Sequence, residues 1–348
     1  MNLYILASLL LALGLGTTIT LTSSHWLLAW MGIEINTLAV IPIMARHHHP
    51  RATEAATKYF LAQASAAATL LFAATTNAWL TGQWDIGQIM HPIPNALMII
   101  ALAMKIGLAP THAWLPEVLQ GLDLPTGLLL STWQKIAPFA LLIQIYPNNT
   151  TLMIILGLTS SLVGGWGGLN QTQLRKILAY SSIAHLGWMA LIMHFSPPLS
   201  ILALLTYFVM TSSTFLVFKL NNATNMNMLA ISWAKMPALT ALAPLLLLSL
   251  GGLPPLTGFM PKLLILQELT KQNLILAATI IALSALLSLF FYLRLTYVMA
   301  LTVSPNNLIG TAPWRLQLYK TTLPTATLTS MALLLLPLTP TTMTLLCS

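Results

Sequence analysis

Long runs of apolar residues recur along the whole chain and are separated by short polar connections. A helix that crosses the hydrocarbon core of a bilayer needs about 20 such residues. The pattern therefore predicts an all-α, polytopic membrane protein with about eleven transmembrane helices. We expect the spans at 3–21, 25–44, 59–81, 95–113, 124–146, 150–169, 176–195, 198–218, 238–256, 274–300 and 321–346.

Two stretches of the chain resemble each other and interrupt an apolar run. The first reads GLAPTHAWLPEVL at 107–119, and the second reads GLPPLTGFMPKLL at 252–264, an offset of 145 residues (252 − 107 = 145). Each contains two prolines, which remove a backbone donor and clash with the preceding turn. We therefore expect a broken helix at both places. Paired interruptions in the two halves of a transporter indicate its ion site.

The offset corresponds to five predicted spans. An odd number of spans per repeat reverses the orientation of the second copy in the membrane, so the pattern predicts two inverted five-helix repeats. The predicted domains are a first repeat at 1–147 and a second repeat at 148–300, followed by a loop and a C-terminal transmembrane helix at 301–348.

Four charged residues lie inside the apolar runs of a chain in which only 6% of residues are charged. Glu34 falls near the middle of the run 26–44, and Lys105, Lys135 and Lys262 occupy comparable places. A charged side chain at bilayer depth costs roughly 2.5–3.5 kcal/mol on insertion scales. Burial also disfavours the charged form of a lysine, so that such a lysine can exchange a proton near neutral pH. We interpret the four residues as a buried path for protons or cations.

The four charges also have structural interpretations. Glu34 could form an ion pair that only locks two helices together, and a transmembrane lysine could extend its ammonium group to the headgroups. Apolar residues flank Lys105 and Lys135 on both sides, which favours burial. Lys262 is intermediate, because the break could expose it.

Two histidines are candidate proton relays. His185 lies within the apolar run 176–195, and His112 lies inside the first interruption. Histidine can take up and release protons at physiological pH. Each could equally be a neutral side chain bonded to a neighbouring carbonyl.

Metal, cofactor and catalytic sites are not predicted in this chain. The triplet at 47–49 is a run of three histidines in a short loop without a fourth ligand, so it does not indicate a metal site. The single cysteine, Cys347, excludes a cysteine-ligated iron–sulfur cluster. The segment GGWGG at 164–168 lacks the spacing of a dinucleotide fingerprint. The net charge of +8 comes from scattered loop residues, which suit lipid headgroups better than nucleic acid.

Three motifs carry a resemblance to a known family. They are MKIGLAPTHAWLPEV at 104–118, LRKILAYSSIAHLGW at 174–188 and LSLGGLPPLTGFMPK at 248–262. Together they resemble the antiporter-like proton-translocating subunits of respiratory complex I, in the form found in animal mitochondria. The similarity runs over the whole chain.

The resemblance implies a hydrophilic axis in the middle of the bilayer. Matched by motif, this axis consists of Glu34 with Lys105, then Lys135, then Lys262. The chain departs from the family at Gln173, where many relatives carry an acidic residue. It also begins later than the longer family members, which have additional helices at the start.

The resemblance further implies a multi-pass core subunit of NADH:ubiquinone oxidoreductase in the mitochondrial inner membrane. Its expected partners are other membrane-arm subunits, including another antiporter-like chain and the small chain 4L, together with membrane lipids. NADH, FMN, iron–sulfur clusters and ubiquinone would be used by other subunits, and this chain would hold no cofactor.

Two other functions share the same buried charges. The second motif would also fit cation/proton antiporter subunits of the bacterial Mrp type, so a separate Na⁺/H⁺ antiporter is one alternative. A non-conducting assembly scaffold, in which the charges form structural ion pairs, is the other.

Overall fold

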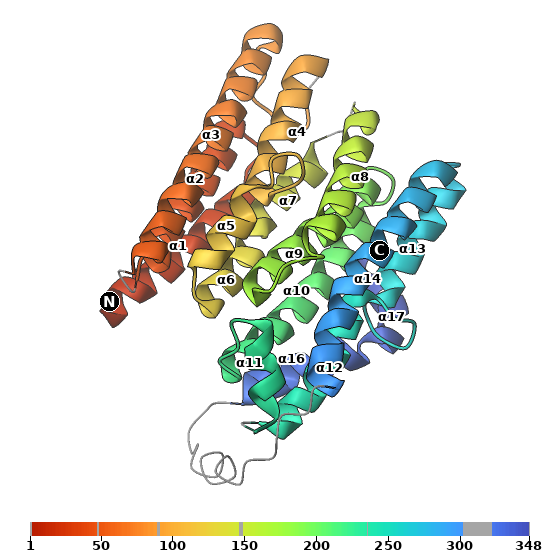
Figure 1. The fold of residues 1–348 in the computed structure, drawn as a ribbon. Helices are drawn as coiled ribbons and strands as arrows, with labels where there is room; N and C mark the ends of the chain where they lie inside the picture. The colour runs from red at the N-terminus through yellow and green to blue at the C-terminus, as the bar shows by residue number, and fades with distance from the viewer. Residues whose placement is uncertain are drawn as a thin grey trace. The chain divides into compact units, whose positions relative to one another are not determined.

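The computed structural model describes residues 2–46, 49–88, 91–145, 149–234, 236–301 and 322–347. Over these residues the fold is helical and contains two isolated β-bridges but no β-strand (Figure 1). Seven helices are long and apolar enough to cross a membrane, or eight if a bent C-terminal pair counts as one span. The predicted all-α, polytopic membrane architecture is confirmed. The chain forms two compact units, residues 1–157 and 158–348, which are described separately below.

The helices of the first unit follow the predicted spans with three differences. They are α1 (Leu3–Thr22), α2 (Trp26–Met44), α3 (Pro50–Thr81), α4 (Pro92–Ile106), α5 (Trp114–Gly121), α6 (Leu124–Ser131) and α7 (Trp133–Gln144), and α8 (Thr150–Gly167) crosses the boundary between the units. The predicted span 95–113 ends early, at Ile106. The predicted span 124–146 is one of the seven candidate spans, Leu124–Gln144, and its regular backbone is interrupted at Thr132 with φ −114° and ψ −71°.

Helix α3 begins nine residues before its predicted start at 59. Pro50 occupies its first position, which suits proline because the missing N–H would have no partner inside the helix. The His49 ring nitrogen Nδ1 accepts a hydrogen bond from the backbone N–H of Arg51 at 3.2 Å. The first turns of α3 are polar and precede the apolar run. A prediction from hydropathy alone therefore placed the start of the helix too late.

Close packing of α1 on α2 sets the position of the helix that carries Glu34. A Cβ atom at Gly16 would lie 2.7 Å from the carbonyl oxygen of Gly32, and a Cβ at Gly32 would lie 2.8 Å from the carbonyl oxygen of Gly16. Small residues allow membrane helices to approach in this way. Helix α2 in turn packs on α3, α3 on α4, and α4 on α7. The helices with Glu34, Lys105 and Lys135 therefore surround one interior.

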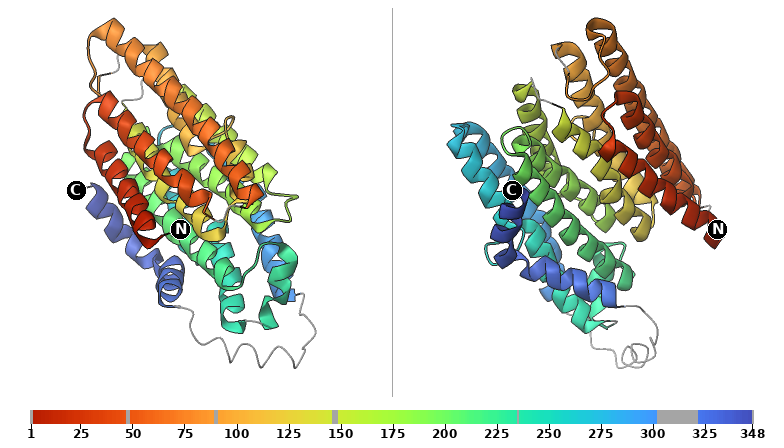
Figure 2. Two further views of the ribbon diagram at one scale, coloured as in Figure 1. Left: turned by 90° about the vertical axis from the view of Figure 1, so that its left-hand side faces the viewer. Right: turned by 180° about the vertical axis from the view of Figure 1, so that it is seen from behind.

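The second unit also consists of helices. They are α9 (Leu174–Ile192), α10 (Pro197–Leu220), α11 (Met226–Ala230), η1 (Ile231–Ala234), α12 (Pro237–Gly251), α13 (Phe259–Lys271), α14 (Ile275–Leu301), α16 (Leu323–Leu334), η3 (Leu336–Leu338) and α17 (Thr339–Cys347). The predicted C-terminal span at 321–346 is occupied by a bent pair of helices, because α16 and the segment Leu336–Leu346 meet at 65° (Figure 2). Pro337 lacks the N–H that would continue the helical hydrogen bonds at this point.

Both units contain an interrupted apolar helix at the predicted place. Helix α4 ends at Gly107 with φ 88°, and α12 ends at Gly252 with φ 82°. Glycine adopts this left-handed conformation at no steric cost and commonly ends helices. The chain becomes helical again at Trp114 and at Phe259.

Candidate functional site

The first unit brings Glu34 and Lys105 together. The Nζ atom of Lys105 lies 3.3 Å from Oε1 of Glu34, and the lysine side chain is 1% exposed while the glutamate side chain is 26% exposed. The Thr37 hydroxyl donates to the backbone carbonyl oxygen of Glu34 at 2.9 Å and lies 3.4 Å from the other carboxylate oxygen. This is a buried lysine whose charge is balanced by a carboxylate with partial access to the surface of the unit.

Lys135 and Lys105 line the same cavity, between α2, α3, α4 and α7. The cavity has a volume of about 10 Å³, which is room for about one water molecule. Lys135 is 2% exposed. Uncharged polar side chains complete the polar part of the lining: Asn36, Thr37, Tyr59, Gln63 and Gln134.

These polar side chains are tied to the helices that carry the lysines. The Tyr59 hydroxyl donates to Oε1 of Gln134 at 3.4 Å, and Nε2 of Gln63 donates to the carbonyl oxygen of Lys105 at 3.3 Å. Nε2 of Gln134 and Oδ1 of Asn36 are buried and, among the described residues, have no hydrogen-bond partner. Buried polar groups of this kind are commonly satisfied by an internal water.

Sequence reasoning missed Tyr59, Gln63 and Gln134. A signal for them was present, because Tyr59 and Gln63 are four residues apart and so share one face of α3, and Gln134 immediately precedes Lys135.

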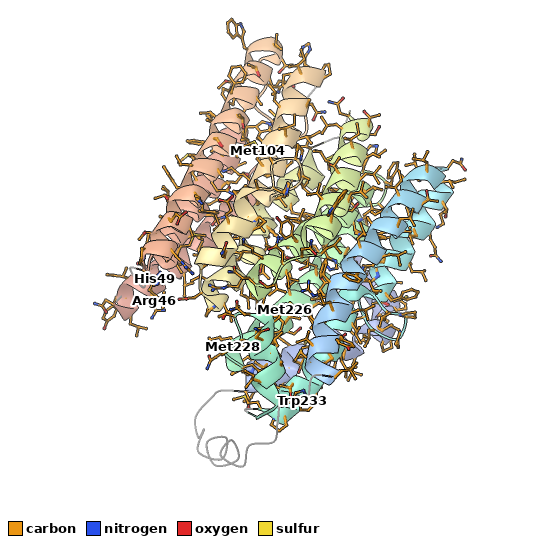
Figure 3. The ribbon with its side chains drawn as sticks, in the orientation of Figure 1. Arg46, His49, Met104, Met226, Met228 and Trp233 are labelled. Carbon is orange, nitrogen blue, oxygen red and sulfur yellow. The ribbon has the colours of Figure 1, made fainter. Side chains whose placement is uncertain are left out.

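The break after α4 is held by neutral donors. The indole N–H of Trp114 donates to the carbonyl oxygen of Met104 at 3.1 Å, and Gln63 bonds the next carbonyl, that of Lys105. Figure 3 labels Met104 on α4. The ring of Trp114 also packs edge-on against Tyr59, with ring centroids 5.8 Å apart. These bonds satisfy carbonyls that the end of the helix leaves without intrahelical partners.

In the second unit, Lys262 lies in the first turn of α13 and reaches back to the end of α12. Its Nζ atom donates to the carbonyl oxygen of Gly251 at 2.8 Å and lies 3.5 Å from that of Leu250. The same nitrogen is 5.9 Å from the ring centroid of Trp188. A cation is favoured at a helix C-terminus, where the carbonyl dipoles concentrate negative potential.

The two candidate histidines have different environments. His185 and Lys262 line one cavity of about 20 Å³, and the His185 ring lies 5.6 Å from that of Tyr207. His112 lies in the connection between α4 and α5, where its Nδ1 is 3.2 Å from the carbonyl oxygen of Pro110. It does not line the cavity of Lys105. His47 and His48 of the histidine triplet lie outside the described residues.

Other charges of the first unit lie at its surface. Lys58 Nζ is 2.9 Å from Glu54 and 2.9 Å from Glu117, and all three side chains are more than 40% exposed. Glu117 faces the surface and belongs to this ion-pair cluster rather than to the cavity.

Family comparisons agree with the three motifs. Residues 23–288 match the NADH:quinone oxidoreductase/Mrp antiporter transmembrane family, and residues 289–343 match the family of NADH dehydrogenase subunit 2 C-termini. A curated protein of Tetraodon nigroviridis, NADH-ubiquinone oxidoreductase chain 2, is 70% identical over 345 residues, which cover 99% of both chains. The chain belongs to the NADH-ubiquinone oxidoreductase chain 2 family. The resemblance drawn from the sequence is thereby confirmed.

Solved structures share the fold of this chain 2 family member. One chain of respiratory complex I from Thermus thermophilus with bound aureothin superimposes with a TM-score of 0.83 and 28% identity, over 97% of this chain and 80% of that one. A chain of the Mrp complex from Dietzia sp. superimposes with a TM-score of 0.74 and 20% identity, over 86% of this chain and 61% of that one. The similarity to the Mrp complex chain shows that the two chains share a fold.

Proposed function

We propose that the chain is a core membrane-arm subunit of NADH:ubiquinone oxidoreductase in the mitochondrial inner membrane, and that it translocates protons. The proton-binding residues would be Glu34, Lys105, Lys135 and Lys262. The main support is the interior of the first unit, where a lysine paired with a carboxylate shares a small polar cavity with a second buried lysine. Buried lysines without such a role would carry a large desolvation cost for no gain in packing.

The Glu34–Lys105 pair provides the control step. At 3.3 Å, and with an effective dielectric constant near 20, the attraction is roughly 5 kcal/mol. Moving one charge against 100 mV costs about 2.3 kcal/mol. Separating the pair would therefore change the free energy of binding a proton to Lys105 on the scale that proton translocation requires. Electron transfer in other subunits would move the pair apart or together. Lys135, on the same cavity, would then gain or lose its proton.

In the second unit, Lys262 and His185 would take part in proton transfer. They share a cavity, and the Lys262 ammonium is held by carbonyls at the end of α12. His185 and His112 would be the proton relays. His185 lines the cavity of Lys262, and Nδ1 of His112 lies 3.2 Å from the carbonyl oxygen of Pro110 in the connection between α4 and α5.

The helix bounds support the inverted repeat. Helices α4 and α12 begin at Pro92 and Pro237 (237 − 92 = 145), and the helices after the breaks begin at Trp114 and Phe259 (259 − 114 = 145). Eleven spans result if α4–α5, α6–α7, α12–α13 and α16–α17 each count as one broken or bent span. Five would form each repeat, with the C-terminal pair outside.

The proposed partners are other membrane-arm subunits, among them another antiporter-like chain and the small chain 4L, together with membrane lipids. NADH, FMN, iron–sulfur clusters and ubiquinone would act in other subunits. This chain would contribute proton transfer and hold none of these groups.

A separate Na⁺/H⁺ antiporter is the second candidate, because the shared fold extends to an Mrp complex. Native electrophoresis of gently solubilised mitochondria separates the two. The proposal predicts that this chain migrates with the band stained for NADH dehydrogenase activity. Migration apart from that band, with sodium-dependent discharge of a pH gradient by the isolated chain, would favour the antiporter.

A further inference from the structure

A hydrogen bond joins the connection between α12 and α13 to the C-terminal helices. The hydroxyl of Thr257, which is 2% exposed, donates to the carbonyl oxygen of Ala332 in α16 at 2.5 Å. The two residues are 75 positions apart in the chain. Most other threonine hydroxyls of the described residues bond a carbonyl three or four positions earlier in their own helix, for example Thr240 to Pro237. Thr257 therefore makes an unusual, long-range contact.

The bend between α16 and η3 makes the Ala332 carbonyl available. In a continuous helix this carbonyl would accept from the N–H of Leu336. Helix α16 ends at Leu334, the backbone turns by 65°, and no bond from Leu336 to Ala332 forms. Ala332 is buried, and a buried carbonyl needs a partner. Thr257 supplies it.

The segment that follows Thr257 fits tightly against α12 and leads directly to Lys262. A Cβ atom at Gly258 would clash with the carbonyl oxygen of Ser249, so this residue touches the last turn of α12. Four residues later, the ammonium group of Lys262 bonds the carbonyl of Gly251 at 2.8 Å. The connection has little freedom, and a shift at Thr257 would be passed on to Lys262.

We propose that Thr257 is a positioning residue, through which the C-terminal helix α16 holds Lys262 against the end of α12. Helix α16 is itself anchored, because it packs on α10 and α12 and buries Thr325, Thr329 and Ala332. It also lies within the region matched by the subunit 2 C-terminal family. The C-terminal region would thus act on proton transfer, and this inference rests on the proposed role of Lys262.

The test compares three variants in the assembled complex. Thr257→Val removes the hydroxyl and keeps the shape, Thr257→Ser keeps the hydroxyl, and Thr240→Val removes a buried hydroxyl that bonds only its own helix. We expect Thr257→Val to assemble and to oxidise NADH at the normal rate, with a lowered ratio of protons to electrons. Amide hydrogen exchange in residues 253–259 should rise several-fold. Thr257→Ser and Thr240→Val should match the parent in both measurements.

Two results would overturn the inference. One is an unchanged proton-to-electron ratio in Thr257→Val, and the other is an equal loss in Thr240→Val, which would show a general packing defect. Lys262→Met, measured beside them, separates this inference from the proposed function. If Lys262→Met lowers the ratio and Thr257→Val does not, only the role of Thr257 is wrong. If Lys262→Met leaves the ratio unchanged, the proposed role of Lys262 is wrong as well.

Discussion

The two helix breaks have the same backbone form but satisfy their open carbonyls with different donors. After α4, the neutral groups of Trp114 and Gln63 bond the carbonyls of Met104 and Lys105. After α12, the charged ammonium of Lys262 bonds the corresponding end of the helix. In the first unit neutral side chains perform the capping, and the Lys105 ammonium pairs with Glu34.

This difference separates two ways of holding a proton on a buried lysine. Lys105 is held by the full charge of a carboxylate on another helix. Lys262 is held by peptide carbonyls, whose partial charges are fixed by the backbone. We therefore expect the Glu34–Lys105 pair to control proton transfer. We expect Lys262 to be a carrier whose affinity for a proton changes only if the helix break moves.

Removing the two lysines should therefore have unequal effects on stability. Lys105→Met leaves the Glu34 carboxylate unpaired in a mostly buried site, and we expect a loss of about 2–3 kcal/mol, less than a fully buried pair would show because Glu34 is 26% exposed. Lys262→Met removes hydrogen bonds to carbonyls, at about 1–2 kcal/mol. The rate of thermal inactivation of the purified complex should be higher for Lys105→Met than for Lys262→Met. The double variant Glu34→Gln with Lys105→Met should recover much of the loss, and failure to recover would contradict the ion-pair account.

The two glycines at the breaks provide a matched pair. Alanine at Gly107 or at Gly252 strains a left-handed backbone, which costs about 1–2 kcal/mol in either unit. At Gly252 the added carbon would also lie 2.9 Å from Nζ of Lys262, whereas at Gly107 it would meet the flexible end of Leu115 at 2.8 Å.

We thus expect similar stabilities but a lower proton-to-electron ratio in Gly252→Ala than in Gly107→Ala. Proton uptake during NADH oxidation in reconstituted vesicles measures this ratio. Equal ratios would show that the Lys262 ammonium does not need its place at the end of α12.

The hydrogen bond by which Gln63 caps α4 can be removed without changing the charge of the chain. Gln63→Leu deletes the donor to the Lys105 carbonyl and one polar group of the cavity, and should cost about 1 kcal/mol. Proton transfer should slow, because the cavity would hold water less well. Gln63→Met, which is unbranched and also lacks the donor, should resemble Gln63→Leu in stability. A stability equal to that of the parent in both would exclude the capping role.

The surface cluster should matter least. Glu117→Gln breaks an exposed ion pair with Lys58, and such pairs contribute about 0–1 kcal/mol. We expect no change in the proton-to-electron ratio. A marked fall in that ratio would place Glu117 on the proton path, in disagreement with its exposure.

Features that depend on single residues could be predicted from the sequence. Glycine and proline located both breaks, because their backbone limits act locally. Charges in apolar runs identified Lys105 and Lys135 as buried, whereas the Glu34 side chain is 26% exposed. Features that depend on contacts between helices were not predictable. Tyr59 and Gln63 line the cavity because of the way α3 is rotated about its axis relative to α4. Apolar composition does not determine this rotation.

The histidines show the same limit. His112 and His185 had equal standing in the sequence, since both are single titratable residues in apolar surroundings. The fold distinguishes them, because His185 shares a cavity with Lys262 and His112 bonds within its loop. The C-terminal bend was missed because Pro337 lies in a run that remains apolar on both sides.

The central claim is that the buried lysines carry protons, and Lys135→Met tests it most directly. Methionine has a similar length and is apolar, so the complex should assemble and oxidise NADH while the charge is lost from the cavity. The measurement is the number of protons moved per electron in sealed vesicles. We expect a clearly lower ratio than in the parent. A normal ratio in a fully assembled complex would contradict it and would leave the buried charges a structural role.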